Sequence, residues 1–272
     1  MHDDTARFGL RARWIAHGAI RYHYCVAGDD ARGTPLVLVH GLGVSSAYWR
    51  RIQPLLADDR RVYALDLPGF GRTTRPRRAI DIGALSRALG DWLDALGLIG
   101  TVHLAGHSMG GPVVAAFARA HPDRVSGLVL IGSTIGARGA TTPRQALGLL
   151  RDAPHEFPSL LPVVLRDYLR AGPRRVLRTG ALADEEDTIA AVAHLATSPL
   201  IIRGSRDAVV PIRDTRRLLR ATPGARLIEI PGAAHAVHWS RPRAVADAMA
   251  TFLATWDAGI TLAGGGAAQR TG

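Results

Sequence analysis

The most constraining feature of this 272-residue chain is a regular alternation of short apolar runs with segments of helical spacing. The apolar runs lie at 35–40, 61–67, 101–105, 125–131, 199–203 and 226–230. Most of these runs are nearly continuous, which is typical of strands buried on both faces. The helical segments lie at 45–56, 81–97 and 108–121, from about 213, and near 242–256. This alternation predicts an α/β fold with a mostly parallel central sheet and helices on both faces.

Two further regions depart from this rhythm. Residues 12–27 alternate apolar and polar side chains around a Gly-Ala turn at 18–19, which predicts a strand hairpin. Residues 134–197 contain five prolines and several helical pieces but no convincing strand. We therefore expect an α/β core of residues 1–133 and 198–257, a helical lid inserted at 134–197, and a disordered Gly/Ala-rich tail at 258–272.

The composition bounds the class of protein. Hydrophobic residues make up 47% and charged residues 21% of the chain, as in a folded soluble protein. No apolar run approaches the roughly 18 residues that a membrane span needs, and the first residues lack the apolar core of a secretory signal. The single cysteine, Cys25, cannot form an internal disulfide and suits a reducing compartment. These features predict a cytoplasmic protein without a membrane span.

The net charge of +11 does not by itself predict a nucleic-acid partner. All 34 basic residues are arginines, and the chain contains neither lysine nor asparagine, as expected of GC-rich coding DNA. The arginines are spread along the sequence, without a basic cluster that has interleaved aromatic residues. Residues 41–46 fail the G-x-G-x-x-G dinucleotide pattern, and no phosphate-binding loop or cluster of metal ligands is visible. We expect no nucleic-acid partner, no cofactor and no metal.

Chemically useful groups follow four of the predicted strands, and the first is the His-Gly-Leu-Gly segment at 40–43 after the strand at 35–40. The pattern Gly-x-Ser-x-Gly at 106–110 puts Ser108 between a strand and a helix. Asp207 follows the strand at 199–203, and His235 follows the strand at 226–230. Because the carboxyl ends of parallel strands share one edge of the sheet, a nucleophile, an acid and an imidazole are expected to meet there. Asp214, inside the next helix, and His238, three residues after His235, are weaker candidates for the same roles.

These motifs resemble the α/β-hydrolase superfamily over roughly residues 12–257, including the Asp-Leu-Pro-Gly-Phe-Gly segment at 66–71. The resemblance implies a nucleophile elbow and the chain order Ser, Asp, His of that family. It implies the catalytic residues Ser108, Asp207 and His235, with the backbone N–H groups of Leu42 and Met109 as the oxyanion hole. The supporting residues would be His40, Gly41, Gly43, Gly106, His107 and Gly110. Of these, His40 is expected to hold its loop by hydrogen bonds, and Asp66 to brace its turn.

The expected activity is hydrolysis of a small-molecule ester through an acyl-enzyme on Ser108. The expected substrate carries a small to medium apolar acyl group. Six apolar residues of the insertion could either line its pocket or pack the lid against the sheet: Leu147, Leu150, Phe157, Leu160, Leu161 and Val164. Thioesters, lactones and the vinylogous diketones of meta-cleavage C–C hydrolases are alternative substrates. A non-catalytic small-molecule binder on the same fold is the alternative of another class. The sequence leaves a homo-oligomer open.

One departure from the family concerns the loop after the expected base. Many relatives carry a glutamate a few residues beyond that histidine, whereas this chain has Trp-Ser-Arg-Pro at 239–242. The sequence therefore does not indicate what supports the loop of His235.

Overall fold

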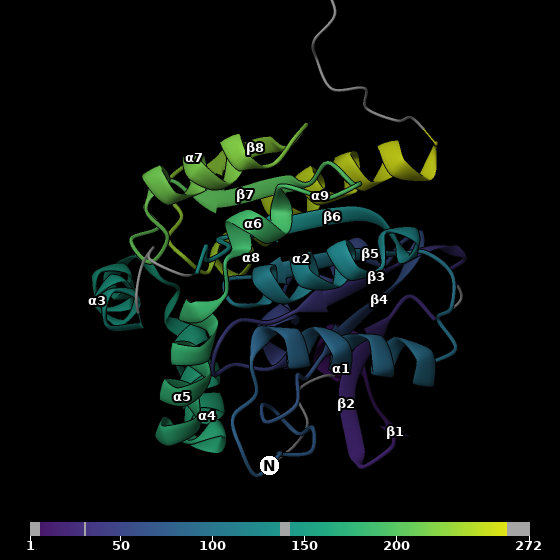
Figure 1. Cartoon of the computed structure of the whole chain (residues 1–272), viewed down its shortest axis with the longest axis horizontal. Helices are drawn as coiled ribbons and strands as arrows, with labels where there is room; N and C mark the ends of the chain where they lie inside the picture. The colour runs from purple at the N-terminus through teal and green to yellow at the C-terminus, as the bar shows by residue number, and fades with distance from the viewer. Residues whose placement is uncertain (1–5, 30, 137–141, 260–272) are drawn as a thin grey trace, which may run out of the picture.

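The computed structural model describes residues 6–29, 31–136 and 142–259, and these residues form an eight-stranded sheet (Figure 1). The strand order is β1-β2-β4-β3-β5-β6-β7-β8. The strands are β1 Arg11–His17, β2 Ile20–Ala27, β3 Gly33–Val39, β4 Arg60–Leu65, β5 Val102–His107, β6 Val125–Ile131, β7 Leu200–Gly204 and β8 Arg226–Ile230. Neighbouring strands from β4 to β8 pair in parallel, whereas β2 pairs antiparallel with both β1 and β4. The sheet confirms the predicted mostly parallel α/β fold.

The continuous apolar runs are explained by burial on both faces of the sheet. Along β3, Val37 and Val39 pack into one core cluster, while Leu36 and Leu38 pack into another. The first cluster lies under α1 Ile82–Ala95 and α2 Gly110–Ala120, and the second lies under α9 Pro242–Asp257. Figure 1 shows α1 and α2 together in front of the strands, with α9 behind them. Both sides of the sheet therefore exclude water, as the sequence predicts.

Helix ends follow local capping rules at the predicted positions. The Asp81 carboxylate accepts a hydrogen bond from the Ala84 N–H at 2.7 Å, at the start of α1. Gly97 lies just beyond the end of α1 with φ +72°, a conformation that glycine adopts without strain. Helix α7, Ile212–Ala221, contains Asp214 as expected.

The segment at 45–56 folds differently from the continuous helix that its spacing predicts. It forms two 3₁₀ turns, Ser46–Trp49 and Gln53–Leu56, separated by a short break. Pro54 lies in the first turn of the second piece and has no N–H to continue a helical hydrogen-bond ladder. Trp49, Ile52 and Leu56 are nevertheless buried against the sheet, so the apolar spacing identified the correct buried side chains.

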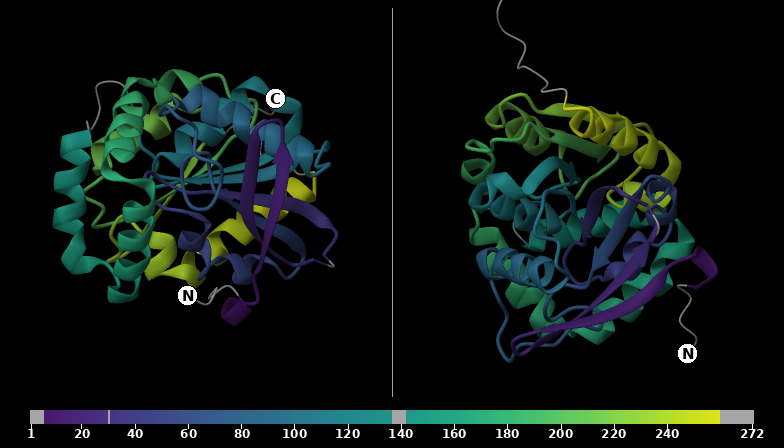
Figure 2. Two further views of the ribbon diagram at one scale, coloured as in Figure 1. Left: turned by 90° about the horizontal axis from the view of Figure 1, so that it is seen from below. Right: turned by 90° about the vertical axis from the view of Figure 1, so that its right-hand side faces the viewer.

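The insertion between β6 and β7 is helical in its described residues. It contains α3 Thr142–Asp152, α4 Leu161–Ala171, α5 Pro173–Glu185 and α6 Thr188–Val192. Figures 1 and 2 show α3, α4 and α5 gathered on one side of the molecule, whereas α6 lies beside α2. Val192 of α6 is fully buried in the core cluster under α1 and α2. The proposed lid is thus α3 to α5, and α6 packs with the sheet domain.

Two other predictions concern the chain ends and membranes. Residues 260–272, most of the expected disordered tail, lie outside the described residues. In the described ranges, no helix is both long and apolar enough to cross a bilayer.

Candidate active site

Ser108 occupies a strained turn between β5 and α2. Its φ is +54°, which makes it the one described residue other than glycine with a positive φ. Its N–H donates to the Ile131 carbonyl of the neighbouring strand at 2.9 Å, which anchors the turn to the sheet. Helix α2 therefore starts at Gly110 and not at Ser108 as the spacing predicts. A non-glycine residue held in this conformation is typical of functional sites.

The two glycines of the motif are required by close backbone contacts. A Cβ on Gly106 would lie 2.3 Å from the carbonyl oxygen of Gly110. A Cβ on Gly110 would lie 2.3 Å from the carbonyl oxygen of Val39, the last residue of β3. The turn can pack this tightly against itself and against β3 only with hydrogen at both positions.

Asp207 and His235 meet at the ends of β7 and β8. The Asp207 Oδ2 atom lies 3.0 Å from the Nδ1 atom of His235, and the other carboxylate oxygen accepts the Val210 N–H at 2.8 Å. Both side chains are buried. Burial lowers the pKa of His235, but the Asp207 carboxylate outweighs it, with help from Glu156 and Asp152, so that the pKa is raised overall. An imidazole held in this way can take up a proton at its other nitrogen.

Ser108 and His235 lie in adjoining parts of the site. The residue before the serine, His107, has its ring 4.6 Å from the His235 ring and its Nε2 atom 3.1 Å from the His235 carbonyl oxygen. Gly132 at the end of β6 lies against Asp207 and His235, where a Cβ would be 3.2 Å from each. Among the described residues, no hydrogen bond joins the Ser108 hydroxyl to the His235 ring. Such bonds are often long before substrate binds.

The competing candidates have other surroundings. His238 is fully buried between aromatic rings, 4.5 Å from Tyr48 and 4.4 Å from Trp49. Burial, followed by repulsion from His235, lowers the pKa of His238 to about 3. Asp214 lies in α7 beside Arg213, with 3.7 Å between Asp214 Oδ1 and Arg213 Nε. The hydrogen-bonded pair of Asp207 and His235 is therefore better placed than either alternative.

The loop after β3 covers the serine. A Cβ on Gly41 would lie 3.0 Å from the Cβ of Ser108, so the 41–43 loop runs directly over the elbow. Within the described residues, neither the Leu42 N–H nor the Met109 N–H donates to a protein acceptor. The start of α2 adds the positive end of its helix dipole at Met109. These groups can stabilise an anion beside Ser108.

His40 holds this loop against the 66–71 turn. Its Nε2 atom accepts the Leu67 N–H at 3.0 Å, so its Nδ1 atom carries the proton donated to the Gly41 carbonyl at 2.8 Å. Burial lowers the pKa of His40, in keeping with this neutral form. The ring therefore has the structural role expected from the sequence.

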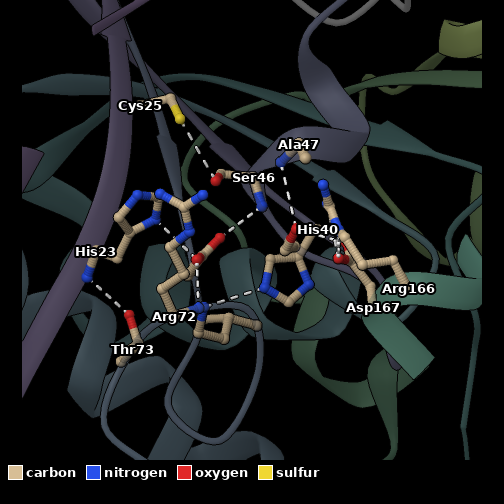
Figure 3. Close-up of polar contacts among 12 residues, drawn as sticks. His23, Cys25, His40, Ser46, Ala47, Arg72, Thr73, Arg166 and Asp167 are labelled. Carbon is tan, nitrogen blue, oxygen red and sulfur yellow. Dashed lines mark hydrogen bonds and ion pairs between the residues drawn. The ribbon is translucent and has the colours of Figure 1, made fainter. Parts of the chain in front are cut away.

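Asp66 braces its turn through several bonds, and its partners His23, Ser46 and Arg72 are labelled in Figure 3. Its carboxylate accepts the Ser46 N–H at 2.6 Å and the Arg72 N–H at 2.8 Å, and lies 2.8 Å from Nδ1 of His23. Burial raises the pKa of Asp66, but His23 and these donors outweigh it and lower the pKa to about 2. Gly71 passes so close to this carboxylate that any Cβ there would collide with it. The expected bracing role is confirmed.

Helix α4 of the proposed lid contacts the same loop. Asp167 accepts a hydrogen bond from the Ser45 hydroxyl at 2.5 Å. The Tyr168 ring covers Gly43, where a Cβ would lie 2.6 Å from the ring and where φ is +80°. Figure 3 shows Asp167 with Arg166 beside the His40 region. The proposed lid and the loop after β3 are thus tied together.

Sequence reasoning missed two carboxylates of the insertion that contact the loops of Asp207 and His235. Asp152 accepts the N–H groups of Ala208 and His235, at 3.0 Å and 3.1 Å. Glu156 accepts the Ala236 N–H at 2.7 Å. Burial raises the pKa of both carboxyls. They support the loop of His235 from a distant segment, so the local sequence around His235 carried no signal for them.

A second set of contacts holds the following residues. The Trp239 indole N–H donates to the Ser159 hydroxyl at 3.2 Å, and Arg51 donates to the Trp239 carbonyl at 2.8 Å. Tyr48, Leu160 and Val163 pack with Trp239 in a small core of their own. The support around residues 239–242, which the sequence leaves open, therefore comes from the lid and from the 45–56 segment.

The lid residues named from the sequence divide into two groups. Leu160 is buried and Val164 packs partly buried against the same small core as Tyr48. Leu147, Leu150, Phe157 and Leu161 are 42–73% exposed. Leu160 and Val164 therefore fit the alternative in which these residues pack the lid against the rest of the molecule. The second group faces solvent to a large extent. No group of three possible metal ligands occurs in the part of the chain that the structure describes.

The fold and this site define the class of protein. The model of the alpha/beta hydrolase family matches residues 36–248, and the chain belongs to this family. A thermophilic esterase from Thermogutta terrifontis has a similar structure, with a TM-score of 0.78 and 25% identity over 91% of this chain and 99% of the esterase chain.

Curated relatives have several activities. A dihydrolipoyllysine-residue acetyltransferase component of the acetoin cleaving system of Pseudomonas putida is 34% identical over 81% of this chain, which spans only 64% of that relative. The 2-hydroxy-6-oxo-6-(2'-aminophenyl)hexa-2,4-dienoic acid hydrolase of Metapseudomonas resinovorans is 27% identical over 89% of this chain and 90% of its own length. A pimeloyl-[acyl-carrier protein] methyl ester esterase of Edwardsiella ictaluri is 30% identical over 86% of this chain and 97% of its own length.

Proposed function

We propose that this α/β hydrolase is a serine hydrolase of carboxylic esters. Ser108 attacks the ester carbonyl while His235 takes its proton, and His235 then protonates the departing alcohol. In the second half, His235 removes a proton from water as the water attacks the acyl-enzyme, and returns that proton to the Ser108 oxygen when the acid leaves. Asp207 orients the ring and stabilises its charged form. The observation that carries the proposal is the 3.0 Å contact between Asp207 and His235 beside a serine with φ +54°.

The oxyanion that forms in each half-reaction would accept the N–H groups of Leu42 and Met109. Each such donor lowers a barrier of this kind by about 2.7–4 kcal/mol. The close approach of Gly41 to Ser108 supports this assignment, because it puts the loop within reach of a carbonyl bound at the serine.

We propose small to medium apolar acyl groups as substrates. The ring of Tyr48, 5.3 Å from that of His107, and the neighbouring side chain of Val44 put apolar surface beside the site and support this preference. Kinetics on 4-nitrophenyl esters from acetate to palmitate test it. We expect kcat/KM to peak at short or medium chains, and equal turnover along the series would contradict the proposal.

Labelling with a fluorophosphonate tests the nucleophile. We expect the modification on the peptide that contains Ser108, with no labelling and no ester turnover in Ser108→Ala. Loss of the nucleophile from a triad costs about a million-fold in kcat. Labelling of another serine, or retained turnover in the variant, would exclude Ser108. Absence of turnover in the wild-type protein, with a tightly bound small molecule, would favour the non-catalytic alternative.

Cleavage of a C–C bond in a vinylogous diketone is the second candidate function. The similarity to the dienoic acid hydrolase over 90% of its length supports it. The His107 side chain counts against it, because enzymes of that group often carry asparagine before the nucleophile. A direct comparison of kcat/KM for such a diketone and for the best ester would decide between the two, and thioester and lactone substrates belong in the same panel.

A further inference from the structure

A cavity of about 360 Å³ lies between the segment after β4 and the turn that joins α4 to α5. It is lined by residues 75–79 on one side and 171–178 on the other. Five of the nine lining residues are arginines: Arg75, Arg77, Arg174, Arg175 and Arg178. None of the nine belongs to the candidate catalytic site. The fold therefore brings together two short arginine-containing segments that are distant in the sequence.

The walls of this cavity are joined by arginine side chains. Arg175 donates to the carbonyls of Pro76 and of Arg78, the latter at 3.3 Å and across 97 residues of sequence. Arg75 donates to the carbonyl of Arg170 at the end of α4. A guanidinium has five N–H donors, so these backbone contacts leave donors free for a ligand.

The positive charge in the cavity is not neutralised by the described residues. None of the five arginines forms an ion pair with another described residue, whereas Arg60 pairs with Asp59 and Asp257, and Arg203 pairs with Glu229. Burial, and then repulsion from Arg75, lowers the pKa of Arg175. Asp81, the acidic residue closest in sequence to the first wall, caps α1.

The first turn of α5 also lines the cavity. Gly172 precedes this 13-residue helix, and Gly172 and Pro173 are both lining residues. No side chain caps the start of α5. Pro173 has no N–H, and the N–H groups of Arg175 and Val176 donate to the Gly172 carbonyl, so the helix acts in the same direction as the guanidinium groups through its dipole alone.

We propose that this cavity binds a multiply charged anion of diphosphate size. Guanidinium groups recognise phosphate oxygens through paired N–H donors, and a single phosphate would leave most of the five unmatched. A cavity of 360 Å³ also has room for more than one phosphate group and falls within the range of small-ligand sites. The cavity is a binding site additional to the proposed ester site, and its test does not depend on hydrolysis.

Calorimetric titration with inorganic pyrophosphate tests the proposal. The variant removes three exposed arginines that make no backbone contact, in Arg77→Ala/Arg174→Ala/Arg178→Ala. The matched control removes the same charge from the outer face of α7, in Arg216→Ala/Arg217→Ala/Arg220→Ala. We expect saturable binding of one pyrophosphate, at least about tenfold weaker in the cavity variant and unchanged in the control, because each removed arginine takes its charged hydrogen bonds to phosphate oxygens with it.

Three results would overturn the proposal: no saturable binding, equal weakening in both variants, or binding of orthophosphate and acetate as tight as that of pyrophosphate. The source of the diphosphate is separated by a second comparison. If it is part of the acyl substrate, the cavity variant raises the KM for acetyl-coenzyme A but not for S-acetyl-N-acetylcysteamine, which lacks phosphate. If the diphosphate is a free ligand, pyrophosphate still binds more weakly to the cavity variant than to the wild type, but the variant has the wild-type KM for both thioesters.

Discussion

At the scale of single residues, the environment of His235 depends on three carboxylates from distant parts of the chain. Asp207 contacts the ring directly, and Asp152 and Glu156 of the insertion accept the N–H groups of the loops that carry the pair. All three raise the pKa of His235. The insertion therefore acts on the base through charge as well as through position.

The substitution Asp152→Asn should move the pH dependence of ester hydrolysis. Only neutral His235 can accept the serine proton, so kcat/KM rises with pH through the pKa of this residue. Removing the negative charge of Asp152 lowers that pKa, and we expect the acidic limb of the profile to shift to lower pH. A profile of kcat/KM against pH measures the shift.

Two controls accompany this measurement. Asp152→Glu keeps the charge and should retain the acidic limb of the wild type. Asp123→Asn removes a charge from an exposed turn after α2 and should leave the profile unchanged. A lower rate for Asp152→Asn without any shift of the limb would mean that Asp152 acts only as a structural support.

The buried histidines predict a loss of stability in mild acid. Burial lowers the pKa values of His40, His107 and His238, the last to about 3, so these rings bind protons less readily in the folded protein than in the unfolded chain. The unfolded chain takes up protons below about pH 6.5, so each ring makes the free energy of unfolding fall by up to about 1.4 kcal/mol per pH unit below that value. Urea unfolding between pH 7 and pH 5 measures this slope.

The substitution His238→Phe should reduce the pH dependence of the free energy of unfolding, because the unfolded chain then has one proton fewer to take up. The His238 ring lies among Tyr48, Trp49 and His107, which are also ring side chains. His17→Gln, on exposed β1, should retain the wild-type slope. An unchanged slope in His238→Phe would show that His238 is already charged in the folded state.

At the scale of elements, the turn from β5 into α2 depends on the absence of side chains. Gly106→Ala and Gly110→Ala each introduce a Cβ 2.3 Å from a backbone oxygen, and backbone cannot move aside as a flexible side chain does. We expect each to lower the free energy of unfolding by about 1–3 kcal/mol or more and to reduce turnover. Thermal and urea unfolding measure the loss. Gly100→Ala, which meets nothing within 4 Å, is the matched control and should be nearly neutral.

The elements also differ in how firmly they are held. Every residue of β5 is buried, whereas α4 buries only Val163, Asp167 and Ala171.

At the scale of the whole molecule, we therefore expect amide hydrogen exchange to be faster in α3, α4 and α5 than in the central strands, because local opening there exposes less apolar surface. Exchange followed by mass spectrometry measures this. Equal protection of α4 and β5 would contradict a lid that opens separately from the sheet.

The sequence alone determined the layered architecture and the candidate catalytic residues. Local apolar spacing predicts which strands are buried and which face of a helix packs inward, and a serine between two glycines indicates a strained turn. Each of these features depends only on a few neighbouring residues. The sites of Asp207 and His235 followed from the strands that precede them, since parallel strands end at one edge.

Only the tertiary structure decided what surrounds those residues. Asp152 reaches His235 across 83 residues of sequence, and Arg175 reaches Arg78 across 97. Such contacts depend on how the insertion folds back over the strand ends, and no local pattern encodes that path. The sequence therefore predicted neither the contacts that support the His235 loop nor the arginine-lined cavity, because both are made by side chains that only packing brings together.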